Sequence, residues 1–452
     1  MNSKHLSLCV ALCLGTACLL PGVAMAASQN DTTQSKDAAL AQKMAAMQQQ
    51  ITALQDQLNA LREQQAEQSQ AAAAQKQTAK DNSNKISKLA ETQSAEKKKS
   101  ENGIKVSGAM RFQYSYEGYN KGNEHRVGDT DFDIFRLNFS GKVDNIELQA
   151  EWRWFQYMSA IKYAWLGYDF NKTSQLQLGI TRIPFGNQPY DSHSYFFSSN
   201  YYLGLEDTYN AGIEYVYAGD PWNVQLAFFK NDDMGGIDGY VSNRADGYSY
   251  KVVGARAPNE GIYADPQDPI ATANTLSARV AYTLKPTSDL KVELGASGLR
   301  GDLENPTTTV GHYDAYALHM NAFYKRWNVQ AQAAHYQYAV GGATRMAVGA
   351  YAFYDSIPAS ADTYTFNVKY HQPVQWGPVH GLDFYNDYSL VTNKSGNLPN
   401  TFMNVLGVGV SAGDLYTYFD FLTARNQPFV GGSMAGDGEV EHRFNINFGF
   451  YF

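Results

Sequence analysis

The sequence predicts an all-β protein, a transmembrane antiparallel β-barrel preceded by an N-terminal α-helical coiled coil. Three observations support this prediction: few charged and many aromatic residues, a heptad pattern near the N-terminus, and alternation of apolar and polar residues over 103–452. The 452 residues include 18% charged side chains, 13% aromatics and 38 glycines. A barrel that faces lipid outside and water inside has such a composition, because both kinds of residue alternate along every strand.

The overall charge limits the partners. There are 36 Lys and Arg residues against 44 Asp and Glu, a net charge of −8. We expect no nucleic-acid partner, because proteins that bind nucleic acids present a basic surface. A helical membrane protein is also excluded, since it would need apolar runs of about 20 residues.

Residues 1–26 are predicted to be a secretory signal peptide. Lys4 and His5 give a basic start, residues 6–20 are apolar, and Ala24-Met25-Ala26 forms a small-x-small cleavage site. The alternative is an N-terminal transmembrane helix, for which the apolar stretch is shorter than the roughly 18 residues required. All three cysteines lie in this segment, so we expect neither disulfides nor thiol-based metal sites in the mature chain.

Residues 27–102 are predicted to form a periplasmic coiled coil and linker. They contain no proline and no aromatic residue, and their apolar residues follow spacings of four and three, which form the seam of a coiled coil. These residues are Leu40, Met44, Met47, Ile51, Leu54, Leu58 and Leu61. Ile86 and Leu89 return in the same register, so we expect one interrupted rod. Its apolar stripe implies an oligomer. A disordered linker is the alternative, because 71–84 has little to bury.

Residues 103–452 are predicted to be an outer-membrane β-barrel. Alternating segments of about 10 residues, the length of a tilted membrane-spanning strand, recur from Ile104 to the end. Seventeen segments alternate, but a barrel with both termini in the periplasm needs an even number. The Ala- and Gly-rich segment 344–354 is the weakest and is assigned to an outer loop. Sixteen strands are therefore predicted, with eighteen as the alternative.

Aromatic residues and prolines agree with this assignment. The pairs Trp152/Trp154, Tyr163/Trp165 and Tyr215/Tyr217 are predicted to lie in interfacial girdles. Every proline after the signal peptide lies between predicted strands, where its missing N–H breaks no ladder. The alternation from Phe444 to Phe452 resembles the C-terminal sorting signal of outer-membrane barrels. We therefore expect the protein in the Gram-negative outer membrane, in contact with its lipid.

Four stretches resemble motifs of the phosphate-selective porin O and P family. They are 135–141, 162–168, 178–186 and 386–389. A coiled coil before the barrel also occurs in this family and in the related dicarboxylate channels. The resemblance implies sixteen strands, a homotrimer, a passive solute channel and a long loop after strand five, here 184–208, that folds into the lumen. Phosphate selectivity does not transfer, because residues 103–452 carry 25 basic and 35 acidic residues.

Charged residues suggest how the lumen is lined. Alternation places a group of basic side chains, which we call the basic strip, on the inward face of strands that become neighbours when the barrel closes. The strip consists of Arg111, Arg136, Arg153, Lys162 and Arg443. The inward loop would carry Asp191, His193, Glu206 and Asp207. A basic wall opposite an acidic loop would create a transverse field that orients charged solutes. Alternatively, the strip pairs with Glu147, Glu151 and the loop acids and holds the loop down; both can be true.

No enzymatic motif is found. The sequence has no G-x-S-x-G, H-E-x-x-H or P-loop pattern, so no catalytic residue, metal site or cofactor is expected. The function predicted is a porin, a passive channel for small hydrophilic solutes with a preference for anions such as carboxylates or phosphate. The alternatives are an aromatic-lined sugar channel, or a structural tether in which the rod binds peptidoglycan.

Overall fold

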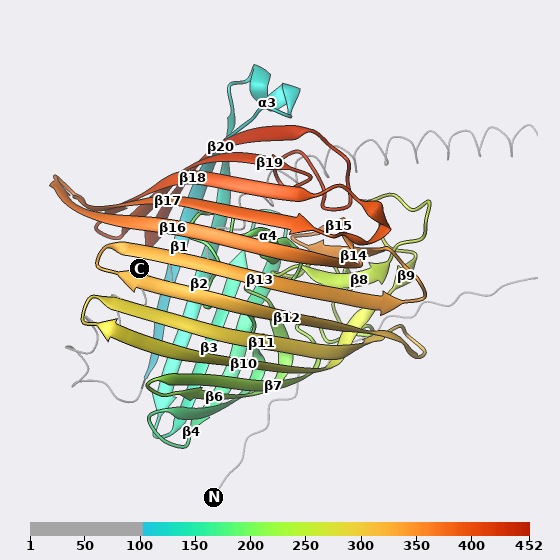
Figure 1. Ribbon diagram of the computed structural model, residues 1–452, viewed down its shortest axis with the longest axis horizontal. Helices are drawn as coiled ribbons and strands as arrows, with labels where there is room; N and C mark the ends of the chain where they lie inside the picture. Colours follow the sequence, from blue (N-terminus) through green and yellow to red (C-terminus); the bar gives the residue numbers. More distant parts are fainter. Residues whose placement is uncertain (1–102) are drawn as a thin grey trace, which may run out of the picture. The chain divides into compact units, whose positions relative to one another are not determined.

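The computed structural model describes residues 103–452, so the predicted signal peptide and coiled coil lie outside the described residues. Sixteen antiparallel strands close into a barrel (Figure 1). Sixteen was the predicted number, and the alternative of eighteen is wrong. The barrel strands, in order, are β1 (Ile104–Glu117), β2 (Asp129–Val143), β3 (Ile146–Trp154), β4 (Ser159–Asp169), β5 (Ser174–Arg182), β6 (Tyr209–Ala218), β7 (Trp222–Asp232), β10 (Ala271–Thr287), β11 (Leu290–Glu304), β12 (Thr309–Tyr324), β13 (Trp327–Val340), β16 (Ser360–Trp376), β17 (Val379–Thr392), β18 (Thr401–Ala412), β19 (Leu415–Arg425) and β20 (Val440–Tyr451).

The barrel closes where β1 pairs with β20. The last pair of backbone hydrogen bonds joins Gly108 to Phe452, with N···O distances of 2.8 and 3.1 Å. Gly108 is required by close packing, since an added Cβ would lie 2.4 Å from the carbonyl oxygen of Arg136 and 2.6 Å from the Phe452 ring. The Phe452 ring stacks on Phe135 of β2, which strengthens the seam.

Apolar side chains face outward, as the alternation predicts, but β4 changes phase within the strand. The pairing of β3 with β4 shifts register between Glu151 and Trp152, so Tyr163 lies opposite Glu151 and Trp165 opposite Gln149. Both aromatic side chains therefore face inward. Their assignment to an interfacial girdle is wrong, because a shift of one residue exchanges the two faces of a strand.

Four prolines lie within strands, which corrects the prediction that all lie between them. Pro286 and Pro373 occupy register shifts near the ends of β10 and β16, where a missing N–H breaks no regular ladder. Pro269 and Pro358 are the last residues of β9 and β15, which lie outside the barrel wall.

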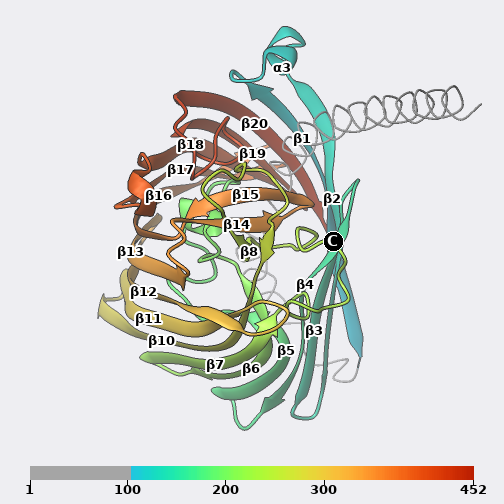
Figure 2. The ribbon, with the colours of Figure 1, turned by 90° about the vertical axis from the view of Figure 1, so that its right-hand side faces the viewer.

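A second sheet of four strands, which we call the inner sheet, lies inside the ring of barrel strands in the view along the barrel (Figure 2). Its order is β15 (Phe353–Pro358), β14 (Arg345–Ala350), β8 (Lys251–Ala255) and β9 (Asp268–Pro269). β8 and β9 belong to the loop after β7, and β14 and β15 to the loop after β13. The segment 344–354 is thus not part of the barrel wall, as predicted, although it contains strand β14.

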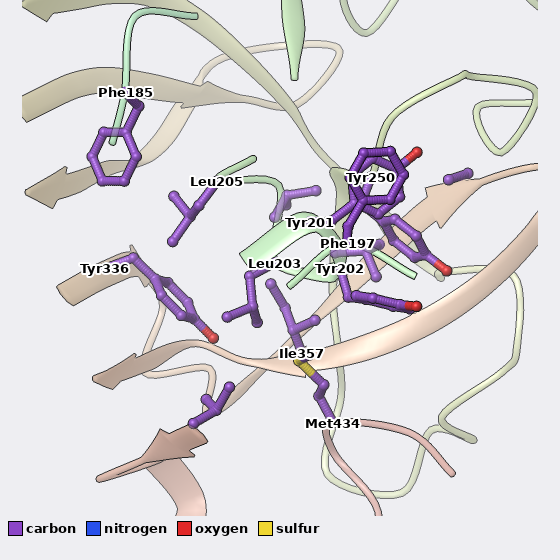
Figure 3. Close-up of a cluster of buried hydrophobic side chains, with 14 of the residues drawn as sticks. Phe185, Phe197, Tyr201, Tyr202, Leu203, Leu205, Tyr250, Tyr336, Ile357 and Met434 are labelled. Carbon is purple, nitrogen blue, oxygen red and sulfur yellow. The ribbon is translucent and has the colours of Figure 1, made fainter. Parts of the chain in front are cut away.

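Helices are few and short: α3 (Lys121–His125), α4 (Ser199–Tyr202) and the 3-10 turn η1 (Ser395–Asn397). None of the helices in residues 103–452 has the length and apolar character that crossing a membrane requires. α4 belongs to the loop between β5 and β6. Around it lies the buried core, an aromatic cluster that includes Phe197, Tyr201, Tyr202 and Tyr250 (Figure 3). The rings of Phe197 and Tyr201 stack with their centres 4.3 Å apart.

Candidate functional site

The loop from β5 to β6, residues 183–208, crosses the inside of the barrel; we call it the lumenal loop. Its first residues are fixed to β10, β11 and β13. Arg279 Nε donates to the carbonyl oxygen of Gly186 at 2.7 Å, and Gly186 N donates to Ser297 Oγ at 2.9 Å. Asn187 N donates to Gln332 Oε1 at 2.7 Å. The loop therefore begins along the wall that follows β7.

The middle of the lumenal loop is held by β13, β16, β17 and β19, which we call the far wall. Thr365 Oγ1 donates to Asp191 Oδ2 at 2.8 Å, and Asn367 Nδ2 donates to the Asp191 carbonyl oxygen at 2.8 Å. Asp387 accepts the backbone N–H of His193 at 2.6 Å. Side chains of the far wall thus supply most of the partners of this part of the loop.

The ring of His193 has an acceptor at each nitrogen. Nδ1 lies 2.9 Å from Asp387 Oδ1, and Nε2 lies 2.7 Å from Asn328 Oδ1. The orientation of the Asn328 amide is fixed, because its Nδ2 donates to Asn321 Oδ1 and to the carbonyl oxygen of Ala322. These two contacts hold the His193 ring between β17 and β13, with Asp387 as the partner of Nδ1.

The end of the lumenal loop lies against β4, β5 and β6. The Asp207 carboxylate accepts from Lys162 Nζ at 2.8 Å and Arg182 Nη2 at 2.9 Å. The hydroxyls of Tyr209 and Tyr248 each donate to it at 2.7 Å. Burial alone would raise the pKa of Asp207, but the charges of Lys162 and Arg182 hold that pKa well below its usual range.

All five side chains of the basic strip face inward, and each is at most 2% exposed. Every one has a carboxylate partner. Arg111 pairs with Asp133, and Arg443 pairs with Glu117 at 2.9 Å. Glu151 contacts both Arg136, at 3.6 Å, and Arg153. The alternative in which the strip forms ion pairs therefore describes this structure, with Asp207 as the partner of Lys162.

Glu147 is not among these partners. It accepts from the side-chain amides of Gln149 at 2.7 Å and Gln175 at 2.9 Å.

Aromatic rings of the loops cover the basic strip. The guanidinium of Arg153 lies 4.1 Å from the centre of the Tyr248 ring, and that of Arg443 lies 5.2 Å from Phe196. Lys162 Nζ lies 4.9 Å from the Tyr248 ring. Such contacts stabilise buried cations through the negative face of the ring. The cover seals the strip from solvent.

Among the loop residues that were predicted to face the strip across a constriction, only Asp207 meets it, and it does so in direct contact. Asp191 and His193 lie on the far wall. Glu206 folds the loop on itself by accepting the backbone N–H of Asp191 at 2.9 Å and of Ser198 at 3.0 Å. The predicted field between a basic wall and an acidic loop is therefore wrong for this arrangement, because the loop crosses the lumen and touches both walls.

Asp191 has an unusual environment. Burial, and then the nearby Glu206 carboxylate, raise the pKa of Asp191 to about 8. The side chains of Asn187, Asn200 and Thr365 donate to its carboxyl oxygens and act in the opposite direction.

Arg182 is the functional residue that sequence reasoning missed. By alternation it shares the outward face of Leu176 and Leu178, so its lumenal contact was not expected. It is, however, the last residue of β5, and its side chain reaches Asp207 where the chain turns inward. The signal that could have found it is its position directly before Ile183-Pro184, at the predicted start of the inward loop.

Cavities around the lumenal loop are small. One of about 30 Å³ is lined by four tyrosines, Tyr250, Tyr313, Tyr336 and Tyr338, and has room for a water molecule or two. Within residues 103–452, no group of three or more His, Cys, Asp or Glu side chains is arranged to hold a metal ion.

Comparison with known families identifies the fold. A model of the phosphate-selective porin O and P family matches residues 104–357, more than half of the chain. The chain belongs to this family. The family that its motifs resemble is thus confirmed. A search of curated proteins found no match to this chain.

The chain is similar to several solved outer-membrane proteins. The outer membrane channel DcaP of Acinetobacter baumannii is 10% identical, with a TM-score of 0.50 over 78% of this chain and 98% of its own. An anion-selective porin from Comamonas acidovorans is 12% identical, with a TM-score of 0.49 over 78% and 100%. A trimer form of OmpT of Vibrio cholerae is 14% identical, with a TM-score of 0.47 over 78% and 100%. At such a low identity, the likeness to DcaP shows only the fold of this chain.

Proposed function

We propose that this porin is an outer-membrane channel through which small hydrophilic anions diffuse, carboxylates and phosphate among them. One observation carries the preference for anions: cations outnumber their carboxylate partners along one wall. Glu151 is shared by Arg136 and Arg153, and Asp207 is shared by Lys162 and Arg182. Each shared carboxylate thus faces two cations, and charged strips on a pore wall select permeating ions.

The test is the reversal potential of purified protein in planar bilayers under a gradient of potassium chloride. The expected sign is that of preferred chloride passage, and it should weaken as salt rises, because the screening length falls to about 3 Å at 1 M. Added acetate or phosphate should reduce the chloride current. A reversal potential of the opposite sign would contradict the proposal.

A sugar channel is the second candidate, and the tyrosines that lie close together on β12 and β13 favour it. Tyr313 and Tyr338 stack at 5.5 Å, and Tyr336 lies beside Tyr338. Flat aromatic surfaces of this kind suit the apolar faces of sugars. Reduction of the current by millimolar glucose or maltose, but not by acetate, would favour this candidate over the first.

The proposed assembly is a homotrimer whose coiled coil stands in the periplasm. The heptad pattern of residues 40–61 supports an oligomer, and the outward apolar residues of the barrel suit lipid or a neighbouring subunit. We expect trimers by light scattering after residues 27–102 are deleted, because the barrel wall alone can form the interface. Monomers would assign the interface to the coil instead. Pull-down with peptidoglycan, with and without these residues, tests the tether.

A further inference from the structure

The structure contains an anion site that is already filled. We propose that Lys162, Arg182, Tyr209 and Tyr248 form a binding site for the carboxylate of a solute, and that Asp207 occupies this site as a tethered counter-anion while the lumen is sealed. The inference rests on the proposed function, since it names the place on the basic wall where a permeating carboxylate binds.

The coordination of Asp207 is that of a bound oxyanion. Lys162 and Arg182 supply two positive charges at 2.8 and 2.9 Å. Tyr209 and Tyr248 supply two hydroxyl donors at 2.7 Å. An ionised carboxylate has about four lone-pair sites, so these four donors are as many as it accepts.

The tether and the site belong to different parts of the fold. Lys162, Arg182 and Tyr209 lie on β4, β5 and β6 of the barrel wall and Tyr248 lies in the loop after β7, whereas Asp207 lies on the lumenal loop. Its backbone has a φ of 51°, in the left-handed region that Asp tolerates better than most residues but at some cost. If the loop moves, the carboxylate leaves and the wall donors stay in place.

The surroundings restrict the ligand class. The rings of Tyr190 and Tyr209 lie 5.5 Å from the Arg182 guanidinium, and the ring of Tyr248 lies 4.9 Å from Lys162 Nζ. These flat walls leave room for a planar group of the size of the Asp207 carboxylate. A planar carboxylate therefore fits better than a tetrahedral phosphate.

The experiment compares Asp207→Asn with Asp233→Asn. The second variant also removes the carboxylate of a buried Asp–Lys pair, that of Asp233 with Lys251 in the loop after β7. Acetate is titrated against the chloride current in planar bilayers and against the thermal stability of the detergent-solubilised full chain. Phosphate is titrated in parallel.

Asp207→Asn should need roughly ten-fold less acetate than wild type for the same effect, the ratio that one charge-assisted hydrogen bond supplies. Asp233→Asn should need as much acetate as wild type. In Asp207→Asn, the phosphate concentration needed for the same effect should fall by less than the acetate concentration. Asp207→Glu, which keeps a tethered carboxylate, should also behave as wild type and shows that the site tolerates substitution.

Equal acetate dependence in wild type and Asp207→Asn would overturn the inference and leave Asp207 as a structural contact. An equal gain in Asp233→Asn would also overturn it, because the effect would then follow net charge. The proposed function can fail separately. If acetate stabilises Asp207→Asn against heat but the channel prefers cations, the carboxylate site stands and the proposal of an anion channel is contradicted.

Discussion

The two walls that hold the lumenal loop do so by different chemistry. On the far wall, hydroxyl, amide and backbone donors meet carboxylates, as where Thr365 donates to Asp191 and the backbone N–H of His193 donates to Asp387. On the basic wall, Asp207 is held by two cations at once. An arriving anion competes most strongly where two cations face a single carboxylate. Solutes can therefore act on one end of the lumenal loop while the other end anchors it.

The largest effect is expected on the basic wall, from Arg136→Ala combined with Arg153→Ala. Both substitutions remove the cations that contact Glu151, which is 3% exposed, and breaking a buried pair costs about 3–5 kcal/mol. We expect a marked loss of thermal stability and a reversal potential shifted towards cations at low salt. Adding Glu151→Gln should restore the stability but not the preference for anions. An unchanged reversal potential would mean that these arginines serve the fold alone.

On the far wall, Asp387→Asn tests the anchor. The substitution removes the charge that His193 faces, and it weakens an acceptor of the backbone N–H groups of His193 and Ser194. We expect a loss of about 3 kcal/mol. The loop should become open to added protease, while the sign of the reversal potential stays as in wild type. Limited proteolysis followed by mass spectrometry measures this, and a protected loop would show that other contacts suffice.

A pH series sharpens the comparison further. Because the pKa of Asp191 is raised to about 8, the folded chain binds more protons than the unfolded chain between about pH 4 and pH 8. Its contribution to stability is therefore greatest at acidic pH and is lost as the pH rises towards 8. Melting temperatures should be higher at pH 6 than at pH 9, and this slope should flatten in Asp191→Asn. An equal slope in both proteins would assign the effect to another group.

The smallest effect is expected at the seam, from Phe452→Ala. The ring is 52% exposed and stacks on Phe135 and Phe450 outside the lumen, so its loss should cost about 1 kcal/mol. We expect less assembled protein in the outer membrane and normal conductance in the channels that form. Quantified heat-resistant bands give the first value and single-channel records the second; normal assembly would count against a sorting role.

Alternation within each strand could be read from the sequence, and so could much of the barrel. The strand number and the inward direction of residues such as Arg136 and Arg153 follow from it, because the period of two is local. It failed where the backbone departs from that period. The register shift beside Trp152 turned Tyr163 and Trp165 inward.

Contacts between distant segments could not be predicted. The pairing of Asp207 with Arg182 depends on the path of the lumenal loop. That path is set by side chains from five or more strands, such as Ser297, Gln332 and Asp387. No local pattern encodes which wall a loop touches, so the loop acids were expected to face the strip together.

The inner sheet has a consequence for the order of folding. Ala255 pairs with Met346 about 90 residues later, and each belongs to a loop whose ends are fixed by different barrel strands. Contacts so remote in sequence form late, because the chain between them must first be ordered. These loops therefore join after the hairpins that carry them, β7 with β10 and β13 with β16, have paired, and until then the interior is still wet. Its buried cations lose their water only after their partners are within reach.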